Sequence, residues 1–223
     1  MHDAGVPSGS YLHLDPVDGS PVAVEEFSCA AGPVGWRYVA TVRDPDGREA
    51  GRIDVTLDTG GRQVQVVLAA GGWTLRGGVA GRETLWVRRP VPGAGPGAGA
   101  GAEVDRGAEG AGVERVEVAA GFTGRSPAFL VAAARLLRLS AGARARLRLV
   151  EVTEPAVGTR LTEQGWSLDG VTSYPTETDP LPVARYRVAD LATGQARDVH
   201  LAGDVVVAAG NLELTALHSP PTL

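Results

Sequence analysis

Apolar and polar residues alternate along most of the chain, which is the pattern of β-strands with one buried face. In residues 36–43 and 62–69 the apolar side chains recur at every second position, so Val64 and Val66 are expected on one face and Gln63 on the other. Short turns rich in glycine and aspartate separate such segments. Closely spaced strands joined in this way predict an antiparallel meander of about ten strands.

Residues 126–140 break this pattern, because their apolar residues recur at helical spacing. Ser126 can cap the first turn, and Pro127 suits the first helical position. Gly142 is expected to end the helix after Ser140. A helix of about 12 residues is marginal on its own in water, so this one must bury its apolar stripe against the sheet.

These elements predict a mainly β (α+β) protein. We expect one long curved antiparallel sheet, a half-barrel, with a single apolar helix packed across its concave face. The alternative is a closed β-barrel or a two-sheet sandwich with a capping helix. Residues 1–20 are rich in Gly, Pro, Ser and Asp and predict a flexible tail. Residues 21–223 then form a single β-rich domain, in which residues 90–112 are a flexible Gly/Ala/Pro loop.

Composition argues against several kinds of function. The formal net charge of −5 disfavours nucleic acid or an anionic membrane as the main partner. All 21 Lys and Arg positions are arginine, so neither a lysine Schiff base nor a P-loop lysine is possible. Cys29 is the single cysteine, the N-terminus has no signal-peptide pattern, and no apolar run is long enough to span a bilayer. We therefore expect a soluble, cytoplasmic protein.

The sequence contains no pattern typical of a catalytic or metal site. The four histidines are scattered without metal-ligand spacing, and no G-x-S-x-G motif occurs. We therefore predict no catalytic residues, no metal and no cofactor. Aromatic and arginine residues remain as candidates for a cleft, which would take an apolar body on the aromatic groups and an anionic or sugar head on arginine. These candidate ligand-binding residues are Trp73, Arg76, Trp86, Arg125, Phe129 and Trp166. Alternatively, the tryptophans fill the core and the arginines face water.

Three stretches resemble the bacterial glycolipid-binding family. Residues 51–77 look like its early hairpins, which end in a Gly-Trp strand. Residues 122–142 (FTGRSPAFLVAAARLLRLSAG) are similar to its Thr, Pro and Arg-Leu helix segment, and residues 149–168 are similar to its strand, Pro and Gln-aromatic run. The resemblance implies a half-barrel like that of the Lol lipoprotein carriers, with a lipid or glycolipid as ligand. The chain departs from the family pattern at Gly124, where Asn is expected, and in the additional residues 90–112.

Three functions are compatible with these features. The first is a non-catalytic protein that binds an amphipathic small molecule, a lipid or glycolipid, between the curved sheet and the helix. The second is a small metal-free enzyme using the same cavity, with a buried carboxylate or histidine facing Trp73 or Trp166. The third is an interaction module with a fully packed core and no ligand. A cavity distinguishes the first two from the third, and convergent ionisable groups distinguish the second from the first.

Overall fold

The computed structural model describes residues 6–91, 112–177 and 179–223. In this part of the chain, fifteen strands form one sheet and a single α-helix lies against it. The strands are β1 (Ser8–Leu14), β2 (Pro21–Gly32), β3 (Gly35–Arg43), β4 (Glu49–Leu57), β5 (Gln63–Ala70), β6 (Trp73–Ala80), β7 (Glu83–Pro90), β8 (Val113–Val118), β9 (Phe122–Thr123), β10 (Arg144–Thr153), β11 (Gly158–Tyr174), β12 (Leu181–Asp190), β13 (Ala196–Ala202), β14 (Val205–Ala209) and β15 (Leu212–Leu217). The helix is α1 (Pro127–Leu137).

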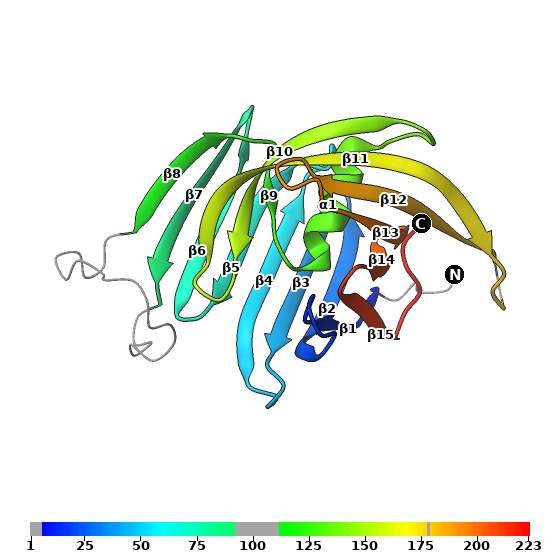
Figure 1. Cartoon of the computed structure of the whole chain (residues 1–223), viewed down its shortest axis with the longest axis horizontal. Coiled ribbons are helices and arrows are strands. Elements are labelled where there is room, and N and C mark those ends of the chain that lie inside the picture. The colour runs from blue at the N-terminus through cyan, green and yellow to red at the C-terminus, as the bar shows by residue number, and fades with distance from the viewer. Residues whose placement is uncertain (1–5, 92–111, 178) are drawn as a thin grey trace.

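The order of strands in the sheet follows the chain in two runs. Strands β8 to β1 lie side by side, β1 pairs with β15, and the order then continues from β15 back to β9. Every neighbouring pair is antiparallel except β9 and β10. The sheet is strongly curved, with α1 on its concave side (Figure 1). The predicted mainly β half-barrel with one apolar helix is confirmed, since this sheet is neither a closed barrel nor a sandwich.

The two edges of the sheet approach each other at residues 119–121, which connect β8 to β9. The amide of Ala120 donates to the carbonyl of Arg148 on β10 at 2.8 Å. The hydroxyl of Thr84 on β7 donates to the carbonyl of Ala119 at 2.9 Å. Strands β8 and β9 pair with β7 and β10 respectively and not with each other. The sheet is therefore open, but a short connection bridges its edges at one place.

Helix α1 begins where the sequence predicts and ends earlier. The Ser126 hydroxyl accepts a hydrogen bond from the amide of Ala128, and the proline between them occupies the first turn. Residues 127–133 are all buried, as the apolar stripe requires. The predicted end at Ser140 is wrong, because Arg138 adopts a left-handed conformation with a φ of 45° and ends the helix without a glycine.

The core lies between α1 and the concave face of the sheet. Aromatic rings from β1, β2 and β3 pack there in a row. The ring centroids of Tyr11 and Phe27 lie 4.8 Å apart, and those of Phe27 and Tyr38 lie 5.5 Å apart. The ring centroid of Trp36 lies 5.8 Å from that of Tyr38. The β4–β5 turn also approaches the helix closely at Gly61. The φ of this glycine is +85°, and a Cβ there would lie 2.6 Å from backbone atoms of the last helical turn. The helix therefore packs against both the strands and this turn.

Three further expectations from the sequence are wrong. Residues 8–14, expected in a flexible tail, form β1 in the middle of the sheet, between β2 and β15. Gln63 is buried and Val64 is exposed, against the predicted alternation, because a bulge at Val64 shifts the register between β4 and β5. The strands also number fifteen, more than the predicted ten. Most of the predicted flexible loop, residues 92–111, lies outside the described residues.

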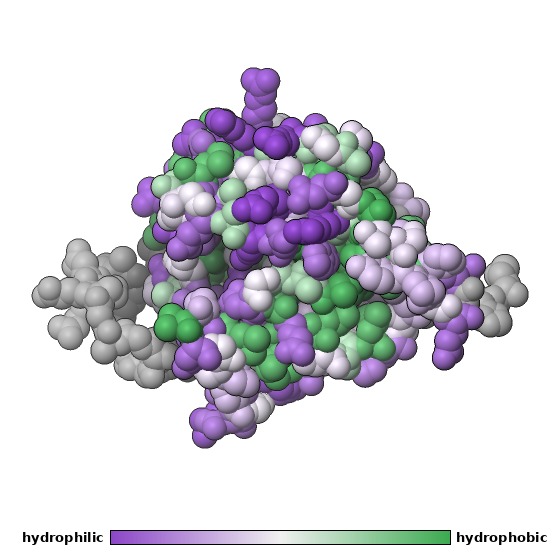
Figure 2. Space-filling model, turned by 45° about the vertical axis from the view of Figure 1, so that its right-hand side comes forward, coloured by the Kyte–Doolittle hydropathy of each residue, from purple (hydrophilic) through white to green (hydrophobic). Residues whose placement is uncertain are grey.

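The surface of the molecule is mixed in polarity. On the face seen in Figure 2, hydrophilic residues form a band across the middle and hydrophobic residues gather below it. Arg144, Arg146 and Arg148 of β10 are exposed and alternate with less exposed residues of the same strand. Among the described residues, no helix is long and apolar enough to cross a membrane.

Candidate functional site

Three of the predicted ligand-binding residues, Trp86, Phe129 and Trp166, are buried in the core. The ring of Trp86 packs edge-on against Phe122 at 5.9 Å between centroids. The ring of Trp166 packs in the same way against Tyr186 at 5.7 Å. These side chains fill the space between sheet and helix and leave almost no surface for a ligand.

The other three predicted residues lie apart from one another. Trp73 on β6 is covered by the guanidinium of Arg88, whose central carbon lies 3.5 Å from the ring centroid. Arg76 is exposed and lines a wide trough of about 810 Å³. Its neighbour Leu75 is buried in the core. Because successive side chains of a strand point to opposite faces, Arg76 lies on the face of the sheet away from the helix. Arg125 lies two residues before the first residue of the helix and lines a pocket at the helix start. Arg76 and Trp86 line one shallow pocket of about 360 Å³, but the six residues do not line one cleft.

A groove of about 410 Å³ lies where the two edges of the sheet approach each other. We call it the seam groove. It is formed by the β4–β5 and β6–β7 turns, the residues that follow β8, strand β10 and the second half of α1. Its apolar residues are Val79, Val118, Ala119, Ala120, Leu136 and Leu147, and its arginines are Arg62, Arg82, Arg146 and Arg148. An apolar floor edged by guanidinium groups suits a ligand with an apolar body and an anionic head.

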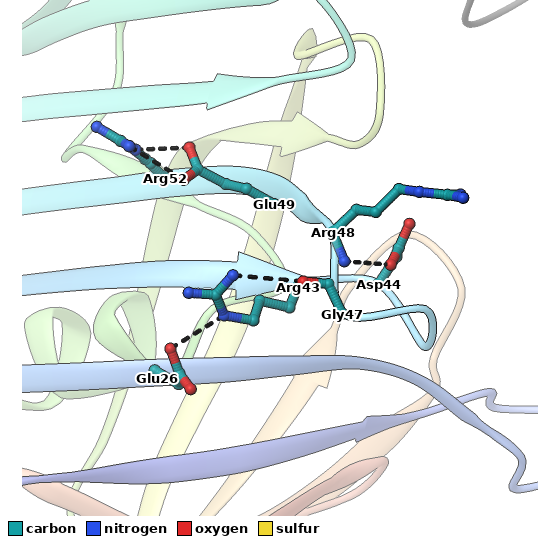
Figure 3. Close-up of polar contacts among 7 residues, drawn as sticks. All are labelled: Glu26, Arg43, Asp44, Gly47, Arg48, Glu49 and Arg52. Atoms are coloured by element: carbon teal, nitrogen blue, oxygen red, sulfur yellow. Dashed lines mark hydrogen bonds and ion pairs between the residues drawn. The ribbon is translucent and has the colours of Figure 1, made fainter.

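The four arginines of the seam groove have no carboxylate within ion-pair distance among the described residues. Arg43 on β3 and Arg52 on β4, by contrast, are held by carboxylates (Figure 3). Arg43 donates to Glu26 at 3.2 Å, and Arg52 makes two hydrogen bonds to Glu49, at 2.6 and 3.0 Å. The seam groove therefore contains four arginines that form no ion pair with an acidic side chain of the described residues.

A second pocket, of about 310 Å³, lies at the start of α1. We call it the helix-start pocket. Its residues come from β1, β9, β10, β11, β13, the β14–β15 region and the segment before the helix, so the curvature of the sheet brings them together. The polar ones are His13, Thr123, Arg125, Glu151, Thr153, Glu154, Gln164, Arg197 and Asn211. This pocket is thus richer in hydrogen-bonding groups than the seam groove.

His13 links the helix-start pocket to Glu25, a carboxylate with no exposed surface. Nε2 of His13 lies 2.9 Å from Oε2 of Glu25. The hydroxyls of Tyr38 and Ser126 donate to Oε1 at 2.7 and 2.6 Å. Burial, and next the charge of Glu25, raise the pKa of the Tyr38 phenol, which therefore keeps its donor proton. Three partners around one carboxylate compensate for its removal from water.

Two charged residues at the helix-start pocket have shifted pKa values. Desolvation, and next the charge of Glu25, raise the pKa of Glu154. Desolvation lowers the pKa of Arg197, and the charge of Glu151 acts in the opposite direction. Both Glu154 and Arg197 are exposed to solvent, which screens these electrostatic effects. Each shift has the direction that desolvation gives to a charged group.

The buried carboxylate and histidine are convergent ionisable groups, but their hydrogen bonds go to Tyr38 and Ser126 and not to Trp73 or Trp166. The described residues contain no group of three or more His, Cys, Asp or Glu that could hold a metal ion. Cys29 is buried, and burial, followed by the charge of Asp204, raises the pKa of its thiol. This thiol is therefore poorly suited to act as a nucleophile.

Of the six residues predicted from the sequence, Arg125 alone lines either the seam groove or the helix-start pocket. The signal for His13 is the alternation within residues 8–14, where His13 shares a face with Tyr11. The signal for Arg146 is its place in an alternating row of exposed residues on β10. Neither pattern indicates which distant strands lie beside His13 or Arg146 in the folded protein.

Comparison with known proteins finds a structural likeness. No protein-family model matches the chain, and no curated protein matches it. The crystal structure of a DUF1089 family protein from Pseudomonas aeruginosa is similar to this chain with a TM-score of 0.44 and 13% sequence identity. The likeness covers 90% of this chain and 88% of that chain.

Proposed function

We propose that the protein binds an amphipathic molecule with an anionic head group, such as a lipid or glycolipid, without catalysing a reaction on it. The observation that carries this proposal is the seam groove, which combines an apolar floor with four arginines that form no ion pair with any acidic residue the structure describes. Its volume of about 410 Å³ is within the range typical of small-molecule sites. We place the ligand at this seam because the space between helix and sheet is filled by buried side chains.

The two parts of the groove make different contributions to binding. Each methylene buried on the apolar floor contributes about 0.8 kcal/mol, so eight of them offer about 6 kcal/mol before the costs of association. A hydrogen bond from a guanidinium to a charged head group adds about 1.5–3 kcal/mol. The apolar chain of the ligand therefore sets the affinity, and the arginines of the groove favour an anionic head group over a neutral one. We expect binding in the cytoplasm, in keeping with a single cysteine.

Isothermal titration calorimetry with dodecyl phosphate and with neutral dodecyl maltoside, each below its critical micelle concentration, tests the proposal. We expect one molecule of dodecyl phosphate per chain, bound at least about tenfold more tightly than the maltoside. The double variant Arg146→Gln/Arg148→Gln should weaken dodecyl phosphate at least about tenfold and leave the maltoside nearly unchanged.

The matched control for this experiment is Arg144→Gln. Arg144 is exposed two residues before Arg146, on the same face of β10, but it does not line the groove. This variant should bind dodecyl phosphate as the wild type does. Equal affinity for the two amphiphiles, or an equal loss in the control and the double variant, would contradict the proposal.

A further inference from the structure

Strand β8 lies at one end of the sheet, and its outer side pairs with no strand in the part of the chain that the structure describes (Figure 1). On its inner side it pairs with β7 along its whole length. Because backbone groups point alternately to the two sides of a strand, every second residue of β8 presents its amide and carbonyl to the outer side. Val113, Val116 and Val118 of this strand are also 45%, 49% and 59% exposed. The edge therefore offers unpaired backbone and apolar side chains to a further strand.

The side chains of β8 alternate between the two faces of the sheet. Arg115 lies opposite Trp86, which is buried in the core, so Arg115 and Glu117 are on the concave face. Val116 lies opposite Leu85 and is on the convex face. Neither Arg115 nor Glu117 forms an ion pair with any described residue. Two opposite charges thus lie on one face of the edge strand, on either side of an exposed valine.

The sequence of β8 is complementary to itself in one antiparallel register. When two copies of a strand pair about a twofold axis, outward-pointing residues lie opposite outward-pointing residues, so one residue lies on the axis. With Val116 on the axis, Arg115 of each copy lies opposite Glu117 of the other copy, and the two Val116 side chains lie opposite each other. With Arg115 or Glu117 on the axis, like charges lie opposite each other. Of the six residues of β8, Val116 alone gives an Arg–Glu pair when it lies on the axis.

We propose that two copies of this chain form a twofold-symmetric dimer by antiparallel pairing of their β8 strands, so that the two sheets continue into each other. Two Arg115–Glu117 pairs lie on the concave face of the joined sheet, and the Val116 pair lies on its convex face. Opposite charges and apolar residues that lie directly opposite each other stabilise antiparallel strands. Pairing occupies the β8 edge of both copies, so assembly stops at two chains. The dimer does not rest on a ligand in the seam groove.

Sedimentation equilibrium of the full chain, from about 1 to about 300 µM in about 0.1 M sodium chloride, tests the dimer. We expect the average mass to increase with concentration toward twice the 23.0 kDa of one chain, with no larger species. Glu117→Arg places an arginine opposite Arg115 at both pairs and should raise the dissociation constant of the dimer at least about tenfold. Arg115→Glu places two carboxylates opposite each other and should have an effect of the same size.

Mixing the two variants in equal amounts separates a lost charge pair from a misfolded strand. Each variant alone should be largely monomeric, but in the mixture every carboxylate at these positions again lies opposite an arginine, so mixed dimers should form.

The matched control is Glu114→Arg, which makes the same change of charge on the same strand. Glu114 is exposed on the convex face and lies opposite Val118 in the proposed register, so this variant should dimerise within about twofold of the wild type. All these measurements are made without an amphiphile, so their outcome is independent of ligand binding at the seam groove. The proposal is overturned if the wild type stays monomeric at every concentration, if larger assemblies form, if the mixture stays monomeric, or if Glu114→Arg weakens the dimer as much as Glu117→Arg.

Discussion

Replacing Glu25 by alanine removes the acceptor on which three buried groups converge. His13, Tyr38 and Ser126 would all lose a partner, and a buried polar group left without a partner costs about 1–3 kcal/mol. Removing one member of a buried charged pair costs about 3–5 kcal/mol in general. We therefore expect Glu25→Ala to lower the free energy of unfolding by about 4 kcal/mol. Glu25→Gln keeps an acceptor for both hydroxyls and an amide beside the His13 ring, so it should cost about 1–2 kcal/mol.

Urea unfolding followed by tryptophan fluorescence measures these changes, because three of the four tryptophans are buried in the core. A double-mutant cycle of Glu25→Ala with His13→Ala isolates the interaction between the two side chains and should give a coupling of at least about 1 kcal/mol. The reasoning is refuted if Glu25→Ala costs less than about 1 kcal/mol, or if alanine and glutamine are equally tolerated.

Other substitutions test the contacts of the helix and of Glu154. Gly61→Ala should cost about 2–4 kcal/mol in unfolding free energy, because left-handed strain adds to a clash with the last helical turn. Gly47→Ala, at a similar φ but in open space, should cost about 1–2 kcal/mol, and equal losses would argue against the clash. Ser126→Ala should cost about 1–2 kcal/mol through the lost cap and the lost bond to the buried carboxylate, and urea unfolding unchanged from wild type would contradict this. The pKa of Glu154 is raised in the folded state, so its protonation stabilises the fold at low pH and this contribution is lost as the pH rises. Glu154→Gln should therefore be more stable than wild type near pH 7 and equal to it near about pH 3.5, and a lower stability of the variant at pH 7 would contradict the sign.

The overall fold could be predicted from the sequence because its signals are local. Alternation along a strand, such as that from Trp36 onward, depends only on which face is buried. The start of α1 depends on Ser126 and the proline after it, which act within one turn. The end of the helix could not be predicted in this way, because Arg138 takes the left-handed conformation that glycine usually provides.

The two candidate sites could not be predicted because they depend on contacts between distant strands. Arg146 and Val118 line the same groove only because the two edges of the curved sheet approach each other. His13 belongs to a segment whose many small and polar residues suggest a tail, yet this segment pairs with both β2 and β15. The tryptophans suggest a ligand cleft by residue type alone, but Trp86 and Trp166 are buried in the core. Residue type indicates which interactions a side chain can make, and the strand order decides whether that side chain lies in the core or in a pocket.

The most direct test of the proposed ligand site is to map where an anionic amphiphile binds. Methyl NMR spectra of the protein labelled at valine and leucine would be recorded with and without dodecyl phosphate below its critical micelle concentration. The proposal predicts saturable shifts at Val79, Val118, Leu136 and Leu147, which line the seam groove, with little change at buried residues such as Val55 and Val199. Saturable shifts confined to another part of the molecule, or no shifts at all, would contradict binding at the seam groove.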